Sequence, residues 1–399
     1  MERRDFIKKS ALAAAGAIMI PAFMKPFEAL ALDELSLYKN LVVVQLSGGN
    51  DGLNTVVPFG NDIYYQMRKG IAIKPDQVIR LNDMQGLNPN LAPLQELYDQ
   101  GWMSVINDVG YPNPDRSHFR SMDIWQTGSD ANQYLSTGWI GRYLDADCDT
   151  CKSPYTAIEV DDSLSLALKG SKKKGIALKD PAALFRNTNE ALFKEMINGD
   201  KAHLDEDNLG YLYKTMIETS SSANYIQNTS KLYKSDAIYP ATSFSNQLKT
   251  VSKFICSGLK TRVYYVSLSG FDTHANQVQQ QGRLLKQYAE GINTFIKDLQ
   301  QNNKLDDTLV VTFSEFGRRV AQNASNGTDH GTANNMFLFG GKLKKQGIYN
   351  AAPDLANLDN GDLKYQIDFR EVYGTLLDKW LDVNNSQILN KKFNTLDFI

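Results

Sequence analysis

The stretch Arg262-Val-Tyr-Tyr-Val-Ser-Leu-Ser-Gly-Phe-Asp-Thr-His274 contains the pattern on which the expected fold depends. A β-branched and aromatic run ends in a glycine and then delivers two candidate metal ligands, Asp272 and His274. The same order occurs at Leu41–Asp51 and at Leu309–Glu315, where each apolar run also leads to an acid. In open α/β sheets, ligands bind outside the carboxyl ends of the strands. The sequence therefore predicts one site shared by several strand ends.

Apolar runs and amphipathic stretches alternate along most of the chain. Two more strands are expected, at Trp102–Val109 and Met336–Phe339. Such alternation predicts an α/β fold with a mostly parallel central sheet and helices on both faces. Between residues 180 and 251 the strand signals fade and polar helical segments dominate, which indicates a helical insertion covering one side of the sheet. Helices are expected at Asn61–Arg68, Leu91–Asp99, Ser117–Trp125 and Thr137–Leu144, after His274 and near the C-terminus.

Composition and charge exclude several classes of protein. The chain has 399 residues, of which 42% are hydrophobic and 22% are charged, as in soluble globular proteins. Its formal net charge of −2 gives no support for nucleic acid or an anionic membrane as a partner. Cys148 and Cys151 form a C-x-x-C, but the second pair that a structural zinc site needs is missing. The two residues are compatible with a local disulfide and equally with two free thiols.

The first 31 residues have the features of an export signal. Arg3–Lys9 contains paired arginines, a polar residue, two apolar residues and lysine, and an apolar stretch follows at Ala11–Phe23. Ala29-Leu30-Ala31 then offers small residues for signal peptidase. The segment resembles a bacterial twin-arginine signal, and an amphipathic N-terminal helix is the alternative. Residues 32–399 are then expected to form a single mature domain without a transmembrane anchor. The resemblance implies delivery by the twin-arginine export machinery to the periplasm or the cell exterior.

Four histidines occur, and three of them stand near acids in glycine-flanked loops or at a helix start. The fourth, His203, is expected at the surface. Asp272 and His274 are separated by one residue, so their side chains share one side if the strand geometry persists. Mixed carboxylate and imidazole ligands suit zinc, manganese or iron better than calcium. If the strand ends converge, the remaining candidate ligands of this divalent metal are Asp51, Glu315 and His330.

Each candidate also has a purely structural interpretation. Asp51 lies in an Asn-Asp-Gly sequence, which is ordinary turn chemistry, and Asp272 is also compatible with a helix cap. Ser117 suits the N-cap of the helix that follows. A helix N-terminus also favours a bound anion and a developing alkoxide, as a nucleophile needs. Arg318, three residues after Glu315, is compatible with a surface ion pair or with a grip on phosphate or sulfate oxygens.

Five motifs carry a resemblance to a known family, and they span nearly all of the chain from residue 40 onward. They are Gly48–Thr55, Arg116–Phe119, Gly270–Asn276, Ser314–Arg318 and Gly327–Thr332. With them the chain resembles an uncharacterised bacterial family of twin-arginine-exported proteins, a domain of unknown function. That family is grouped with the alkaline phosphatase and sulfatase superfamily. Members of the superfamily hold one or two metals at the carboxyl ends of a parallel sheet and attack a phosphate or sulfate ester from a helix N-terminus.

The resemblance implies a role for individual residues. The implied ligands of one or two zinc or manganese ions are Asp51, Asp272, His274, Glu315 and His330. The implied nucleophile is Ser117, and the implied anion-binding residue is Arg318. Further binding residues in the motifs are Asn54, His118 and Asp329. His118 is also a candidate to replace a missing metal ligand.

Two features depart from the phosphatase pattern. Phe316 follows Glu315, where phosphatases have a histidine ligand, and the spacing from Asp272 to His274 is shorter than usual. A second metal site is therefore expected to be weakened or absent. The leading hypothesis is an exported, metal-dependent hydrolase of phosphate or sulfate esters that acts on a small-molecule or glycan ester. The alternatives are a catalytically degenerate secreted binding or scaffold protein with the same fold, and an enzyme of another type, such as a transferase.

Overall fold

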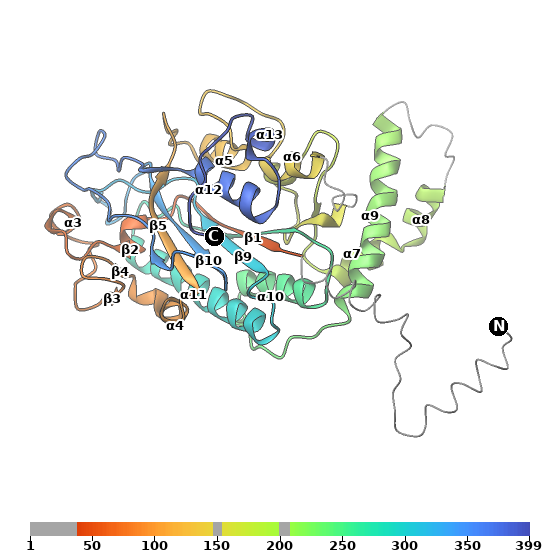
Figure 1. Cartoon of the computed structure of the whole chain (residues 1–399), viewed down its shortest axis with the longest axis horizontal. Coiled ribbons are helices and arrows are strands. Elements are labelled where there is room, and N and C mark those ends of the chain that lie inside the picture. The colour runs from red at the N-terminus through yellow and green to blue at the C-terminus, as the bar shows by residue number, and fades with distance from the viewer. Residues whose placement is uncertain (1–37, 147–153, 199–207) are drawn as a thin grey trace, which may run out of the picture. The chain divides into compact units, whose positions relative to one another are not determined.

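The structure, a computed structural model, describes residues 38–146, 154–198 and 208–399. By its internal contacts, Lys39–Ile399 forms one compact unit (Figure 1). The expected signal segment, the Cys148–Cys151 pair and His203 lie outside the described residues. None of the described helices combines the length and the apolar composition that a bilayer span requires.

A nine-stranded sheet organises the described part of the chain. Its strands are β1 (Asn40–Ser47), β5 (Met103–Gly110), β6 (Ala157–Glu159), β7 (Ile176–Ala177), β8 (Val263–Ser269), β9 (Thr308–Phe313), β10 (Asn334–Phe339), β11 (Gly347–Ile348) and β12 (Ile367–Asp368). They follow the order β11-β5-β10-β9-β1-β8-β6-β7, and β12 pairs with β5. The five strands predicted from the sequence are all present in this sheet. A separate small sheet has the order β2 (Val56–Val57), β4 (Gly86–Leu87) and β3 (Ile79–Arg80).

Strand direction decides which segments meet at one edge of the sheet. β1 pairs in parallel with β8 and with β9, and β6 and β7 continue this parallel arrangement. β10 instead runs antiparallel to both of its neighbours, β9 and β5. The carboxyl ends of β1, β5, β8 and β9 therefore share an edge with the amino end of β10. The predicted mostly parallel sheet is confirmed.

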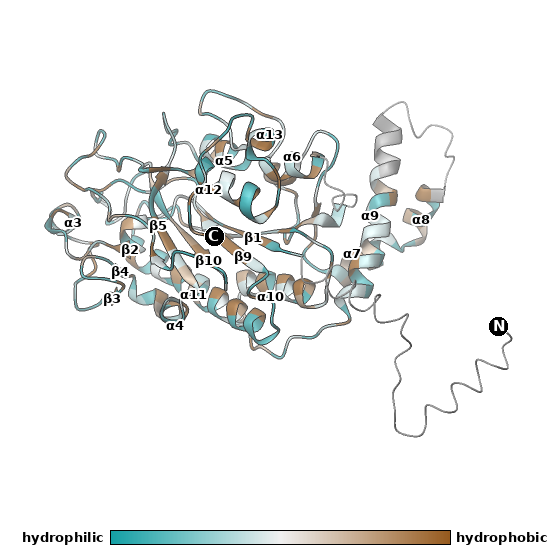
Figure 2. Ribbon diagram, viewed as in Figure 1, coloured by the Kyte–Doolittle hydropathy of each residue, from teal (hydrophilic) through white to brown (hydrophobic). Residues whose placement is uncertain are grey.

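β1 is the buried centre of the sheet. Leu41 and Val43 face one hydrophobic core, and Val42 and Val44 face the other, with at most 1% of each residue exposed. Because both faces are covered, the strand is apolar at every one of these positions instead of alternating. Figure 2 shows the same apolar character along β9 and β10.

Helices cover both faces of the sheet, which confirms the α/β class (Figure 1). They are α3 (Asp62–Met67), α4 (Gln95–Asp99), α5 (His118–Thr127), α6 (Trp139–Asp145), α7 (Pro181–Thr188), α8 (Ala191–Asn198), α9 (Asn208–Ser230), α10 (Ser243–Cys256), α11 (Gln277–Gln301), α12 (Phe369–Thr375) and α13 (Asn385–Leu389). α4, α10 and α11 pack on one face. α5, α6 and α12 pack on the other, and α12 continues into a π-helical turn at Leu376–Trp380.

Two regions that the sequence predicts to be helical contain more than one helix in the structure. The segment between residues 180 and 251 contains α7, α8, α9 and most of α10, and α10 is itself part of the layer that covers the sheet. The single helix expected at Leu91–Asp99 is divided, because Pro89–Leu94 is a 3₁₀ helix and α4 follows it. Pro93 lies at this division and has no backbone N–H for continuous α-helical bonding.

Asp108, near the end of β5, is a buried acid with one unpaired oxygen. The residue is 3% exposed, and its Oδ2 accepts a hydrogen bond from Gln366 Nε2 at 2.7 Å. Its Oδ1 has no hydrogen-bond partner among the described residues. Burial is the main cause that raises the pKa of Asp108 to about 7; the Gln366 hydrogen bond opposes the rise and the charge of Asp354 adds to it. The φ of 51° is left-handed, a conformation that asparagine tolerates well.

We predict that Asp108→Asn stabilises the protein at neutral and alkaline pH. The unfolded carboxyl ionises near pH 4 and the folded one near pH 7, so the free energy of unfolding falls as the pH rises between these values. Removing the carboxyl should raise that free energy by up to about 4 kcal/mol at alkaline pH, and by little in acid. Urea unfolding followed by circular dichroism across this pH range measures the effect. The exposed Asp76→Asn is the matched control, and an equal gain at every pH would contradict the prediction.

Candidate metal centre

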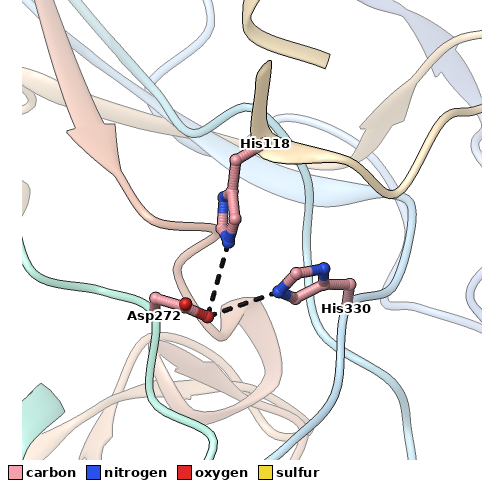
Figure 3. A group of neighbouring side chains, drawn as sticks. All are labelled: His118, Asp272 and His330. Atoms are coloured by element: carbon pink, nitrogen blue, oxygen red, sulfur yellow. Dashed lines mark hydrogen bonds and ion pairs between the residues drawn. The ribbon is translucent and has the colours of Figure 1, made fainter. Parts of the chain in front are cut away.

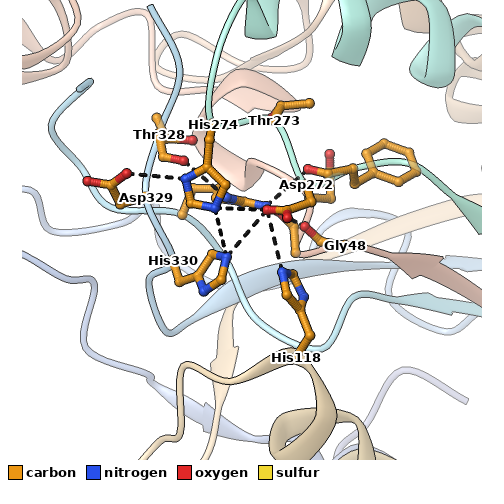
Figure 4. A network of polar contacts seen from close by, with 12 residues as sticks. Gly48, His118, Asp272, Thr273, His274, Thr328, Asp329 and His330 are labelled. Atoms are coloured by element: carbon orange, nitrogen blue, oxygen red, sulfur yellow. Dashed lines mark hydrogen bonds and ion pairs between the residues drawn. The ribbon is translucent and has the colours of Figure 1, made fainter. Parts of the chain in front are cut away.

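The ends of neighbouring strands bring distant parts of the sequence together. Asp272 and His274 follow β8, Glu315 follows β9, and His118 begins α5 after β5. His330 precedes β10, and the antiparallel direction of that strand delivers it to the same edge. The resulting cluster draws its side chains from segments far apart in the sequence (Figure 4).

Three histidine rings point their Nε2 atoms at one carboxylate oxygen (Figures 3 and 4). The distances to Asp272 Oδ1 are 3.0 Å from His274, 3.3 Å from His330 and 3.4 Å from His118. The Nε2 atoms of His274 and His330 are 3.0 Å apart. The structure thus brings together three of the expected ligands, Asp272, His274 and His330, and places beside them His118, the candidate replacement for a missing ligand.

Each of these rings is held from its other side by an oxygen acceptor. The pairs are His118 Nδ1 with Glu315 Oε1 at 2.9 Å, His274 Nδ1 with Asp329 Oδ1 at 3.2 Å, and His330 Nδ1 with the Arg116 carbonyl oxygen at 2.7 Å. Carboxylate and carbonyl oxygens accept hydrogen bonds, so we infer that each Nδ1 carries the proton. A neutral ring then presents an Nε2 lone pair to the centre. Metal-binding histidines are oriented in this way.

The chemistry of these side chains fits a divalent cation. Two lone pairs 3.0 Å apart, on His274 and His330, repel each other unless a cation or a proton lies between them. His118 Nε2 is buried and makes no hydrogen bond within the described structure. Three imidazole nitrogens and a carboxylate oxygen form a donor set that suits zinc and also manganese. The ligand atoms of His118, Asp272 and His330 all lie within 4.8 Å of one another. We call these three residues, together with the adjoining His274, the metal centre, as the candidate site for such an ion.

The pKa shifts favour an ionised Asp272 and a neutral His330, whereas the shift of His118 favours its protonated form. Burial raises the pKa of Asp272, but the hydrogen bond and the charge of Arg318 outweigh burial and hold that pKa at about 2. Burial lowers the pKa of His330, which favours its neutral form. The hydrogen bond to Glu315 raises the pKa of His118, against the opposing effect of burial. Asp272 is therefore ionised at neutral pH and would supply a negative ligand to a bound cation.

The metal centre is open to solvent on one side. The side chains of Asp272 and His274 are 48% and 45% exposed, so a substrate can reach them. Phe316 packs its ring against the rings of both His118 and His330, with centroids 4.8 Å apart in each case. An apolar wall thus stands at the position where the phosphatase pattern has a further histidine ligand.

Arg318 lies beneath the metal centre instead of facing an open space. Its side chain is fully buried, and its Nη2 donates to Asp272 Oδ1 at 2.8 Å. The guanidinium also donates to four backbone carbonyl oxygens, those of Gly48, Gly49, Phe271 and Thr328. The arginine expected to grip a substrate anion thus ties strand-end loops together and orients the central carboxylate.

Asp51 and Asn54 belong to a separate buried network. Asp51 is fully buried, lies 2.5 Å from Arg68 Nη1, and accepts hydrogen bonds from Gln277 and from the Leu53 backbone. Asn54 Oδ1 also accepts from Arg68, at 2.9 Å. The structure does not bring Asp51 into the metal centre. Sequence reasoning missed Arg68, because a single arginine at the end of a short helix belongs to no motif.

Glu315 and Ser117 lie next to His118. Glu315 is fully buried and accepts a hydrogen bond from the Gly48 backbone at 2.8 Å as well as from the His118 ring, so it is placed to orient that ring. Ser117 is the exposed N-cap of α5. Its hydroxyl makes no capping hydrogen bond among the described residues, which leaves it available at the helix N-terminus.

Residues 107–380 match the model of the family described as "Protein of unknown function (DUF1501)", and the chain belongs to that family. No curated protein sequence matches it significantly. Its solved structural neighbours include the PsFucS1 sulfatase from Pseudoalteromonas sp., with 10% identity, a TM-score of 0.42, and coverage of 92% of this chain and 72% of that one.

Two further solved structures are similar to this chain over most of its length. The C-terminal periplasmic domain of EcEptC from Escherichia coli has 12% identity and a TM-score of 0.39, over 91% of this chain and 89% of that one. A protein of the alkaline phosphatase superfamily from Vibrio parahaemolyticus has 9% identity and a TM-score of 0.32, and the match covers 76% of this chain and 60% of that one. Similarity at this level carries no activity over to this chain, so we base its function on its own residues.

We predict that the purified protein binds about one divalent ion per chain and that Asp272→Asn abolishes this binding. The amide removes the charge on which the three rings converge. Asp329→Asn, which alters only the support of His274, should weaken binding by about 10–100-fold. Elemental analysis after dialysis and metal titration measure both effects. The exposed Asp76→Asn should keep the ion, and full occupancy in Asp272→Asn would place the metal elsewhere.

Asp51→Asn should lower stability and leave metal binding intact. The substitution leaves the buried Arg68 guanidinium without a counter-charge, and such a loss costs about 3–5 kcal/mol. Urea unfolding and metal analysis of the folded fraction measure the two properties on one sample, again with Asp76→Asn as the control. A variant that kept its stability and lost its metal would show that Asp51 is a ligand.

Proposed function

We propose that this member of the family is an exported, metal-dependent hydrolase of phosphate or sulfate esters. The observation that carries the proposal is the metal centre, in which the three outer ring nitrogens are already held by oxygen acceptors. Ligands oriented in advance are what a catalytic metal site requires. The exposed side of Asp272 and His274 supports access by a substrate.

The arrangement favours a single ion, zinc or manganese. Asp51 and Glu315, which the resemblance assigns to metal binding, are engaged with Arg68 and with His118. A bound divalent ion would supply Lewis acidity and offset negative charge on the transferred group. The protein's own contribution is to hold Asp272 ionised through Arg318 and to keep the rings in one orientation.

Ser117 is the nucleophile in this proposal. Its exposed hydroxyl lies at the N-terminus of α5, where the helix dipole favours an alkoxide, and His118 of the metal centre is the next residue. The Ser117 oxygen forms a bond to phosphorus or sulfur while the bond to the ester oxygen breaks. The proton that the Ser117 hydroxyl gives up passes, by way of solvent, to the leaving oxygen, which departs as the alcohol. Water then hydrolyses the enzyme ester, releases the anion and restores the hydroxyl.

Arg116 is an arginine that an anionic substrate can reach. Its side chain is 45% exposed and pairs with the buried Asp362, whereas the side chain of Arg318 has no exposure. The Arg116 carbonyl oxygen is hydrogen-bonded to His330 Nδ1. The residue that carries the guanidinium is therefore in direct contact with the metal centre. Arg116 therefore takes the anion-binding role that the sequence suggested for Arg318.

Binding without turnover is the second candidate function, and one observation favours it. Arg318 and Asp51, which the resemblance places in the catalytic machinery, are both fully buried in ion pairs. A secreted binding or scaffold protein would need the metal centre only to hold a ligand. Activity and metal binding, measured separately, distinguish the two functions.

Export is the part of the proposal that rests on sequence alone. The paired arginines and apolar stretch of residues 1–31 support transport of the folded protein by the twin-arginine machinery. The mature chain would then act on small-molecule or glycan esters in the periplasm or outside the cell.

We expect the metal-loaded protein to hydrolyse at least one member of a panel of aryl phosphates, phosphodiesters and sulfates. Ser117→Ala should lower kcat by at least about a hundredfold, because only binding and electrostatic effects remain without the nucleophile. The matched change Ser163→Ala, at an exposed serine elsewhere, should keep full activity. Metal binding with no turnover on any ester would favour the binding protein. Unchanged activity in Ser117→Ala would assign the attack to another group.

A further inference from the structure

We propose that a pocket beside the metal centre binds the aryl group of the substrate, so that the substrates are aryl phosphates or aryl sulfates. This pocket, which we call the ring pocket, is lined by Tyr111, Phe316, Thr332, Ala333, Leu363 and Tyr365, among others. Its volume of about 350 Å³ lies in the range of small-molecule sites. The inference rests on the proposed function and names its substrate class.

The ring pocket and the metal centre are built from the same chain segments. Tyr111 and Pro114 lead to His118, and Thr332 follows His330 by two residues. Phe316 directly follows the residue that supports the His118 ring. The loop between residues 359 and 365 closes another side of the pocket. A ligand in the pocket therefore rests on walls that also position the metal ligands.

Phe316 is shared between the two sites. Its ring lies 4.8 Å, centroid to centroid, from both His118 and His330, and it also lines the ring pocket. Gly49 makes room for it, because a Cβ at that position would lie 2.1 Å from Phe316 Cε2. An aryl group in the pocket and an anion at the metal centre are then neighbours, as the two halves of one ester must be.

The floor of the ring pocket favours an aryl group over a sugar. The Tyr111 hydroxyl is hydrogen-bonded to Ser121 Oγ at 2.7 Å, and Thr332 Oγ1 donates to the Leu363 carbonyl oxygen. A sugar would place hydroxyl groups against this floor and lose their hydration, whereas an aromatic ring has no such groups to desolvate. The other buried lining residues are apolar, namely Gly110, Phe316, Ala333 and Leu363. The polar and charged lining residues Asn113, Asp359 and Lys364 are exposed.

Tyr365 forms part of the rim and offers a test that leaves the metal ligands untouched. Tyr365 is 40% exposed. Its Cβ lies close to Gly110, because a Cβ added at Gly110 would be 2.8 Å from it. Removing the Tyr365 ring should widen the pocket without disturbing a buried core residue.

Calorimetric titration of the metal-loaded full chain with phenylphosphonate and methylphosphonate tests the inference. The two probes share an anionic group that resists hydrolysis and differ in the ring. We expect phenylphosphonate to bind at least about tenfold more tightly, because the pocket removes its apolar surface from water. Tyr365→Ala should abolish most of that difference and Tyr365→Phe should keep it. Tyr134→Ala, at an exposed tyrosine outside the ring pocket, should have no effect.

A second probe separates this inference from the proposed hydrolase. Naphthol carries a ring without the anion, and its fluorescence reports binding with or without metal. Binding of naphthol that is lost in Tyr365→Ala would support the ring pocket even if no ester were hydrolysed. Equal affinity for both phosphonates, without naphthol binding, would overturn the ring pocket and leave the hydrolase proposal standing. Tighter binding of glucose phosphate than of phenylphosphonate would also overturn it.

Discussion

The buried guanidinium of Arg318 is the constraint on which the site depends. It joins the loop after β1, the loop after β8 and the loop before β10 through four carbonyl oxygens and Asp272. Gly48 permits this approach, because a Cβ there would lie 2.5 Å from the Asp272 backbone nitrogen. A buried charge is tolerated only when its hydrogen bonds are satisfied. The acceptors of Arg318 therefore fix the loops relative to one another and set Asp272 at their meeting point.

The same arrangement explains the electrostatics of the metal centre. The ring protons of its histidines are directed outward, to Glu315, Asp329 and a backbone carbonyl. Lone pairs and the Asp272 carboxylate remain on the inside, where Arg318 donates one hydrogen bond. Such a concentration of acceptors is unfavourable by itself and becomes favourable when a cation occupies it. The hydrogen-bond partners of the Nδ1 atoms would thus orient the rings for a metal ion.

Local sequence signals were sufficient for the strands and the α/β class, and they also predicted that Asp272 and His274 lie close together. Asp272 and His274 are close in sequence and leave one strand together, so their proximity is encoded locally. The partners of buried acids are not encoded in this way. Asp51 follows a strand as Asp272 does, but it forms an ion pair with Arg68, which lies 17 residues away at the end of a helix. The apolar residues of β10 also do not indicate the direction of the strand, although this antiparallel direction brings His330 to the metal centre.

In the proposed function, the Phe316 ring bears both on the number of metal ions and on the kind of substrate. A ligand histidine at this position would extend the metal centre toward a second ion. The phenyl ring instead packs against two ligand histidines and lines a neighbouring pocket. An apolar wall also excludes water from one side of the metal centre, which strengthens the attraction between an ion and a bound anion. In the proposed function, the side chain that stands in place of a further histidine ligand is therefore also the one that lines a surface for the organic half of an ester.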